Sequence, residues 1–217
     1  IKPEQTMNRI IENNSFRAIL SNFINRYKKI LFTSIIVLCL IIIFILFNYF
    51  YNKTQNEDAA KIYSQWTKQI QESETNALVL YEDLTSTYIK TGYAHLALLN
   101  YASLEAKKGN NQNALDEFLL LVEATNGFSG NNLLNKLARI NSARLFLEQG
   151  DLDDALKMIK KYIDSPSNAL IHELAGDIFF KKKEFNNAKH QYIIAKEEYS
   201  NETSKLIIDM KIANLEI

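Results

Sequence analysis

The stretch LARINSARLFLEQGDLDDALKMIKKYI, residues 137–163, decides the fold. Its first half carries apolar residues at helical spacing, and Gly150 then marks a turn before a second helix that begins near Ala155. Glycine readily takes the left-handed conformation that ends a helix, and a small alanine lets two antiparallel helices approach closely. The stretch therefore predicts a helix, a tight turn and a second helix.

Two further stretches, which begin at Tyr93 and Ala169, follow the same scheme. An alanine recurs in each second helix, and a small residue stands twelve positions before it: Ala102 and Ala114, Ala143 and Ala155, Gly176 and Ala188. The alanines are 41 and 33 residues apart, and the second interval is close to the tetratricopeptide period of about 34. The longer interval contains an insertion, NGFSGNN at 126–132. A plain helical bundle with coincidental alanines is the alternative, and three matched copies argue against it.

The regions around the repeats are also expected to be helical. The 217 residues include only two prolines and six glycines, which favours an all-α chain. Residues 55–73 and 75–90 predict a leading pair of helices, and NETSKLIIDMKIANLEI at 201–217 predicts a helix that covers the last repeat. We therefore expect a tetratricopeptide-like right-handed α-solenoid with a C-terminal capping helix.

A second decisive stretch is ILFTSIIVLCLIIIFILFNYFYN, residues 30–52, which contains no charge. As a helix, residues 30–51 would be about 33 Å long, which matches the hydrocarbon thickness of a bilayer. The stretch ends in aromatic residues that suit a membrane interface and make a poor signal-peptide cleavage site. It therefore predicts one uncleaved N-terminal transmembrane helix, and neither a signal peptide nor a buried core helix.

The charges on either side of this stretch predict its orientation. Residues 1–29 carry six Lys or Arg and two Glu, a net charge of +4, so the remaining residues of this neutral chain carry −4. By the positive-inside rule, residues 1–29 form a cytoplasmic basic amphipathic segment, which either lies on the leaflet or continues the membrane helix. Residues 53–217 are then a periplasmic domain of a bacterial inner-membrane protein. The acidic domain also argues against a nucleic-acid partner.

The sequence shows no pattern for catalysis. His95, His172 and His190 lie far apart with no metal-ligand spacing, and the single cysteine, Cys39, lies within the apolar stretch. His172 is predicted to be a packed, hydrogen-bonded histidine. Because nucleotide-binding and hydrolase motifs are also absent, we expect no enzyme activity, no cofactor, no metal and no small-molecule substrate.

The repeats offer a surface instead. The repeat register places mixed apolar and charged residues on the groove side of the first helices, and this mixture suits an extended or helical peptide. Leu96 and Ser103 belong to this side of the first repeat. The candidate groove residues are Leu99, Ile140, Arg144, Leu147, Glu173, Asp177 and Phe180. The alternative is that several of these pack against the inserted loop or the next helix.

Three strings carry a family resemblance: ARINSARLFLEQGDLDDAL (138–156), AGDIFFKKKEFNNAKHQY (175–192) and MKIANLEI (210–217). With the basic segment and the membrane helix, they resemble the YfgM family of ancillary SecYEG translocon subunits. The resemblance implies a single-pass inner-membrane protein whose partners are the Sec translocon, periplasmic chaperones and translocated or nascent chains, which it helps to hand over. The basic segment and the central loop depart from the family, and no binding residue is carried over. An envelope assembly or stress-signalling regulator, acting through residues 1–29, is the second hypothesis.

Overall fold

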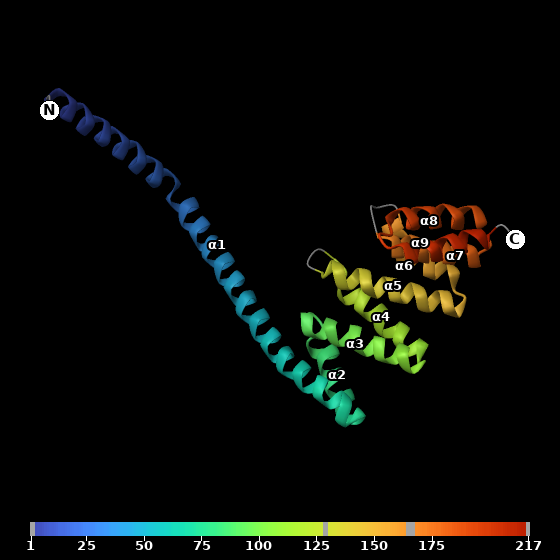
Figure 1. Ribbon diagram of the computed structural model, residues 1–217. Coiled ribbons are helices and arrows are strands. Elements are labelled where there is room, and N and C mark those ends of the chain that lie inside the picture. Colours follow the sequence, from blue (N-terminus) through green and yellow to red (C-terminus); the bar gives the residue numbers. More distant parts are fainter. Residues whose placement is uncertain (1–2, 128–129, 164–167, 216–217) are drawn as a thin grey trace. The chain divides into compact units, whose positions relative to one another are not determined.

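The computed structural model describes residues 3–127, 130–163 and 168–215, and each element in these ranges is an α-helix (Figure 1). The helices are α1 (Pro3–Glu72), α2 (Glu74–Thr87), α3 (Gly92–Lys108), α4 (Asn111–Ala124), α5 (Asn132–Gln149), α6 (Leu152–Ile163), α7 (Ala169–Lys181), α8 (Phe185–Glu198) and α9 (Glu202–Ala213). The predicted all-α fold is confirmed.

The chain divides into two units, residues 1–55 and residues 56–217. From Pro3 on, the first unit is part of α1, and the described large apolar side chains of residues 30–51 are exposed all around the helix, from Ile36 at 44% to Phe47 at 68%. The range Arg26–Glu72 contains a window that is long and apolar enough to cross a membrane. A helix that is apolar on every face and not buried in protein suits a bilayer. The side chains of residues 1–25, which carry most of the predicted amphipathic face, lie outside the described part of the structure.

The three predicted repeats are three antiparallel helix pairs in the second unit, α3–α4, α5–α6 and α7–α8 (Figure 1). Gly109 and Gly150 end the first helix of their pairs with φ of 84° and 89°. These left-handed C-caps confirm the role predicted for glycine. In the third pair Lys183 occupies the matching position, and its φ of 64° is also left-handed.

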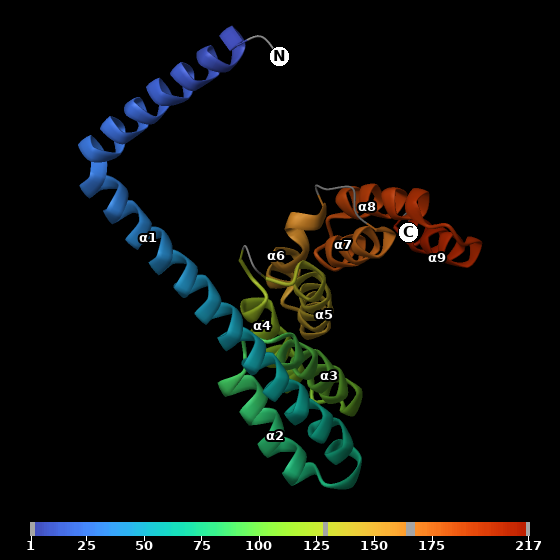
Figure 2. The same ribbon diagram turned by 90° about the vertical axis from the view of Figure 1, so that its left-hand side faces the viewer.

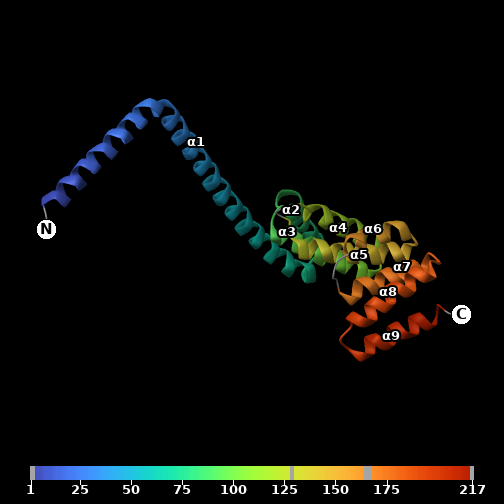
Figure 3. The same cartoon turned by 90° about the horizontal axis from the view of Figure 1, so that it is seen from above.

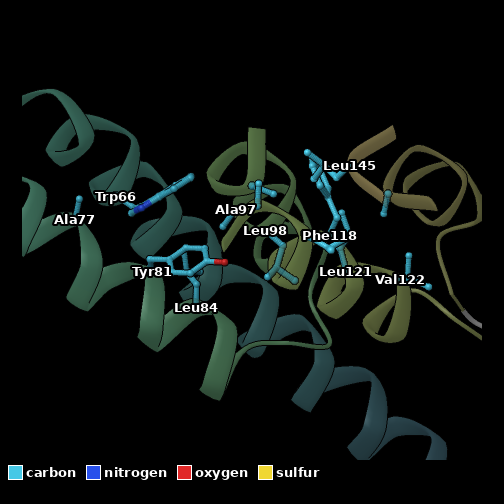
Figure 4. Packing of buried hydrophobic residues seen from close by; sticks show 14 of the residues in the cluster. Trp66, Ala77, Tyr81, Leu84, Ala97, Leu98, Phe118, Leu121, Val122 and Leu145 are labelled. Carbon is cyan, nitrogen blue, oxygen red and sulfur yellow. The ribbon is translucent and has the colours of Figure 1, made fainter. Parts of the chain in front are cut away.

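The small residues of the repeat pattern lie in the buried packing between the helices. Ala102 and Ala114 of the first pair are fully buried, and Phe118, one turn after Ala114, is 2% exposed. Phe118 and Leu121 of α4 lie toward Leu145 of α5 (Figure 4), and α6 likewise contacts α7, so the second helices of the first two repeats also pack on the following repeat. The core therefore continues from one repeat to the next.

A leading helix pair covers the first repeat, as predicted. Residues 56–72 of α1 run beside α2 (Figure 2), and Trp66 and Tyr81 meet with ring centroids 6.0 Å apart. The ring of Tyr81 also contacts that of Tyr101 of α3, with centroids 4.3 Å apart and the planes tilted by 34°. Trp66 and Leu84 are almost fully buried (Figure 4), so this pair extends the core of the repeats.

The capping helix lies at the other end. α9 packs against α8 (Figure 3), with Ile208 fully buried and Lys196 of α8 paired to Asp209 of α9 at 2.6 Å. The 126–132 insertion follows α4, which ends at Ala124, and its last residue, Asn132, is already the first residue of α5; residues 128–129 lie outside the described part.

Candidate functional site

The first helices of the three repeats form one surface. α5 contacts both α3 and α7, so the three helices are neighbours although second helices separate them in sequence. Matching residues stand 13, 10, 6 and 3 positions before the turn residues Gly109, Gly150 and Lys183. We call the surface of these residues the first-helix face. It consists of Leu96, Leu99, Ser103 and Ala106 in α3, Leu137, Ile140, Arg144 and Leu147 in α5, and Leu170, Glu173, Asp177 and Phe180 in α7.

The predicted apolar candidates differ in exposure. Ile140 is 4% exposed and belongs to the core. For this residue the structure therefore supports packing against a neighbouring helix and not a place in an open groove. Leu99 and Leu147 are half-buried against core residues. Phe180 is 37% exposed, and its ring lies 6.0 Å from that of Phe185 on α8. A partner on this face would therefore contact the exposed atoms of Leu99, Leu147 and Phe180.

The two acidic candidates of α7 are held by the capping helix. Lys211 of α9 donates to Glu173 Oε1 at 2.7 Å and to both oxygens of Asp177 at 2.7 and 2.8 Å. Tyr199 donates to Glu173 Oε2 at 2.5 Å, and Tyr192 donates to Asp177 Oδ1 at 2.8 Å. Glu173 and Asp177 are thus brought together, but their oxygens are engaged within the chain.

This network shifts the pKa values of its members. Burial pushes the pKa of Glu173 upward, but the hydrogen bonds from Lys211 and Tyr199 outweigh it, so this pKa lies below the ordinary value. Burial likewise disfavours the charged form of Lys211, but its two carboxylate partners outweigh that cost and raise its pKa. Both groups are therefore charged at neutral pH.

Arg144 lies in a different environment, between α3 and α5. It is exposed, and it borders a hollow of about 230 Å³. The other lining residues are Ser103, Ala106, Phe118, Asn141, Leu145 and Glu148. Ser103 Oγ donates to the carbonyl of Leu99 at 2.7 Å, whereas the side chains of Arg144 and Asn141 make no hydrogen bond or ion pair with the described residues. Arg144 shares this hollow with Ser103, whereas Glu173 and Asp177 are not among its lining residues.

A row of leucines on the first-helix face was only partly predicted. Leu96, Leu137 and Leu170 occupy one register position, and they are 38%, 38% and 36% exposed. Leu96 was assigned to the groove side from the sequence, but Leu137 and Leu170 were not. The equal spacing of these three residues from the turn residues was the signal that would have found them.

A second hollow, of about 480 Å³, lies at the first end of the repeats and is mainly apolar. It is lined by Trp66, Ile70, Ala77, Leu78, Tyr101, Leu104 and Lys108. Leu78 is 43% exposed, while Trp66, which also lines the hollow, is almost fully buried. The hollow lies between the leading helix pair and α3, and few of its lining side chains are polar groups that could orient a polar ligand.

Two of the three histidines, His95 and His172, lie within the helical packing, and His190 is exposed. His172 is buried, and its Nδ1 lies 2.8 Å from Gln191 Oε1, which confirms the predicted packed, hydrogen-bonded histidine. His95 is also buried, and its burial lowers the pKa of the ring. Across the described residues, no three His, Cys, Asp or Glu side chains are grouped as metal ligands.

Comparison with known proteins gives concordant matches. An "Ancillary SecYEG translocon subunit" of Buchnera aphidicola is 26% identical over 193 residues, which are 87% of this chain and 96% of that protein. A protein of the same name from Aggregatibacter actinomycetemcomitans is 28% identical over 126 residues, 58% of this chain and 59% of that relative. These relatives confirm the resemblance carried by the three sequence strings.

A family model also matches most of the chain. The model for the tetratricopeptide repeat-like domain aligns with residues 21–217, which include the apolar stretch and all three helix pairs. The left-handed turns, the buried small residues and the capping helix are the structural features expected of such repeats. This chain therefore belongs to the tetratricopeptide repeat-like domain family.

Proposed function

We propose that the protein is a membrane-anchored interaction protein that acts beside the Sec translocon. Its repeats bind proteins that pass through this channel or lie close to it. The observation that carries this proposal is the similarity to two proteins named ancillary SecYEG translocon subunits, one of which matches 87% of this chain. The first-helix face supports it, because stacked first helices with mixed apolar and charged residues suit polypeptide ligands.

The topology is part of the proposal. Residues 1–29 lie in the cytoplasm, residues 30–52 cross the inner membrane, and residues 53–217 lie in the periplasm. The charge difference between the two sides of the apolar helix supports this orientation. Confinement to the membrane raises the effective concentration of the repeats near a channel in the same bilayer, so weak contacts are sufficient. Periplasmic chaperones are the proposed recipients of the chains that are handed over.

Site-specific crosslinking in intact membranes tests the partners. A photoreactive amino acid replaces Arg144 or Phe180 on the first-helix face, and Lys157 on α6 serves as an exposed control position. We expect the first two positions to capture a translocon subunit, a chaperone or a translocating chain, and Lys157 to capture far less. Capture of none of these from Arg144 and Phe180 would refute the proposed role of this face.

Cysteine labelling tests the orientation. In a Cys39→Ser background, Ser200→Cys and Lys28→Cys each introduce one thiol at an exposed position on opposite sides of the apolar helix. A membrane-impermeant maleimide applied to cells with a permeable outer membrane should label the first variant and not the second. The reverse pattern would place the repeats in the cytoplasm and would refute the proposed orientation.

A further inference from the structure

Two polar side chains of α5, one on the first-helix face and one beside it, have unused hydrogen-bonding capacity. Arg144 and Asn141 lie one turn apart on α5 and border the same hollow of about 230 Å³. Within the described residues neither makes a hydrogen bond or an ion pair. The other α5 arginine, Arg139, donates from Nε to Asn135 at 3.0 Å, so α5 does provide partners for an arginine on another side.

The two acidic side chains of the first-helix face are already engaged. Glu173 and Asp177 both bind Lys211. Among the described residues, Glu148, which borders the hollow, accepts one hydrogen bond, from Asn111 at 3.3 Å, and forms no ion pair with Arg144. The charge of Arg144 is felt by Glu173, whose pKa it helps to lower, but the two side chains do not form an ion pair. Arg144 is thus the charged residue of this face whose donors are available to a ligand.

The chemistry of Arg144 and Asn141 defines the ligand. A guanidinium is a planar fork of five donors that matches both oxygens of a carboxylate. An amide side chain offers one acceptor and two donors, which suits the peptide groups of an extended chain. Resting on the proposed function, we propose that the hollow between α3 and α5 binds an acidic side chain of a partner polypeptide, with Arg144 pairing to its carboxylate and Asn141 to its backbone.

The surroundings favour an acidic residue inside a chain over a chain terminus. Arg144 belongs to the middle of the three first helices, so the face continues on both sides of it. Leu96 and Leu137 lie on the same face, two or three helical turns toward the helix N-termini, and are each 38% exposed. An extended segment with a central Glu or Asp and neighbouring apolar residues matches this combination of groups.

Peptide binding tests this inference on the full chain in lipid nanodiscs. The probes are two fluorescein-labelled decapeptides, acetylated at the N-terminus, amidated at the C-terminus and identical except for a central Glu or Gln between leucines. Fluorescence anisotropy, corrected with empty nanodiscs, gives both affinities. We expect the Glu peptide to bind at least fivefold more tightly than the Gln peptide, because charge-assisted pairs are the stronger ones.

Variants identify the group responsible. Arg144→Gln should reduce the Glu preference to about onefold, and Arg144→Lys should restore only part of it, because an ammonium lacks the fork. Arg139→Gln removes the same charge from the same helix and should keep the preference; thermal unfolding checks that each variant is folded. A preference that survives Arg144→Gln, or that disappears equally in Arg139→Gln, would overturn the inference.

The outcome separates this inference from the proposed function. Equal binding of the Glu and Gln peptides would overturn the carboxylate site and leave a face that binds polypeptides. Binding of neither peptide would also overturn the proposed carboxylate site. Association with the translocon is tested independently by the crosslinking experiment. A free C-terminal carboxylate on the Gln peptide that restores tight binding would show that the hollow binds chain ends, contrary to the inference.

Discussion

The ring of Tyr192 occupies the space that a β-carbon on Gly176 would need: that carbon would lie 2.4 Å from two ring atoms. Tyr192 cannot easily retreat, because it is 2% exposed and its hydroxyl donates to Asp177. The first two repeats have alanine at the matching position, since Phe118 and Ile159 stand where the third repeat has the longer tyrosine. The size of the residue that fits at position 176 of α7 therefore depends on which side chain occupies position 192 of α8.

Gly176→Ala should therefore destabilise the domain although alanine favours a helix. Overpacking of a core costs about 1–3 kcal/mol, which exceeds the gain of about 1 kcal/mol in helix propensity. Chemical denaturation followed by circular dichroism measures the change. Gly92→Ala is the matched control, because a β-carbon at Gly92 meets nothing within 4 Å. An equal effect of both changes would show that Tyr192 does not set the cost.

Lys183→Gly should stabilise the protein. Lys183 holds a left-handed conformation with φ 64° at the position where the other repeats have glycine. A residue with a β-carbon pays roughly 1 kcal/mol in this conformation, and glycine does not. The midpoint of thermal unfolding should rise for Lys183→Gly and fall for Gly150→Ala, whose φ is 89°. A fall in both variants would contradict the role of backbone conformation at these turns.

Lys211→Met should loosen the capping helix. The change leaves Glu173 and Asp177 without their cation, and the loss of a partly buried charged partner costs about 1–3 kcal/mol. Hydrogen exchange of α9 amides should accelerate more than that of α4 amides. Lys205→Met removes a lysine paired to the exposed Glu202 and should cost about 0.5 kcal/mol or less. Equal protection of α9 in wild type and Lys211→Met would rule out this role.

The same contact should make stability depend on pH. The pKa of Glu173 is lower in the folded than in the unfolded chain, so Glu173 stabilises the fold above its unfolded pKa, about 4.3. This contribution is lost as the pH falls through the folded pKa. Lys211, whose pKa is raised, contributes below about 10.5 and loses its contribution above that range. Denaturation at pH 7 and pH 3 should show a smaller acid loss in Lys211→Met than in wild type.

Ser142→Ala should not destabilise the protein and is expected to stabilise it. Ser142 is fully buried, and its Oγ has no hydrogen-bond partner in the described part of the chain. An unsatisfied buried hydroxyl costs about 1–3 kcal/mol, which alanine avoids. Thr125→Val is the contrasting change, because Thr125 Oγ1 donates to Leu121 O at 2.5 Å and lies 3.2 Å from Asn135 Nδ2. A loss of stability in Ser142→Ala similar to that in Thr125→Val would contradict this prediction.

The repeats could be predicted because their determinants are local. Gly109 and Gly150 fix turns through their own backbone freedom, and Ala102 and Ala143 mark close helix packing within one hairpin. The leading pair and the capping helix followed from apolar periodicity. A turn at Lys183 was indicated only by its alignment with the glycines, because lysine itself does not favour the left-handed conformation.

The site was harder to predict because it depends on contacts between distant residues. The pairs of Lys211 with Glu173 and Asp177 span 38 and 34 residues and depend on how α9 is rotated against α8, which the repeat register does not specify. Burial of Ile140 depends on α7, which packs over α5. Arg144 was found from its register, but Asn141 was missed because it lies between the repeating positions.

In residues 56–217, helices that are adjacent in sequence make most of the packing contacts. Such low contact order is associated with fast folding, and a stack of this kind can nucleate locally and grow one hairpin at a time. The domain can therefore acquire structure from its N-terminal side while its last residues are still being synthesised, and a chain halted after any complete hairpin would already contain a packed and partly ordered stack.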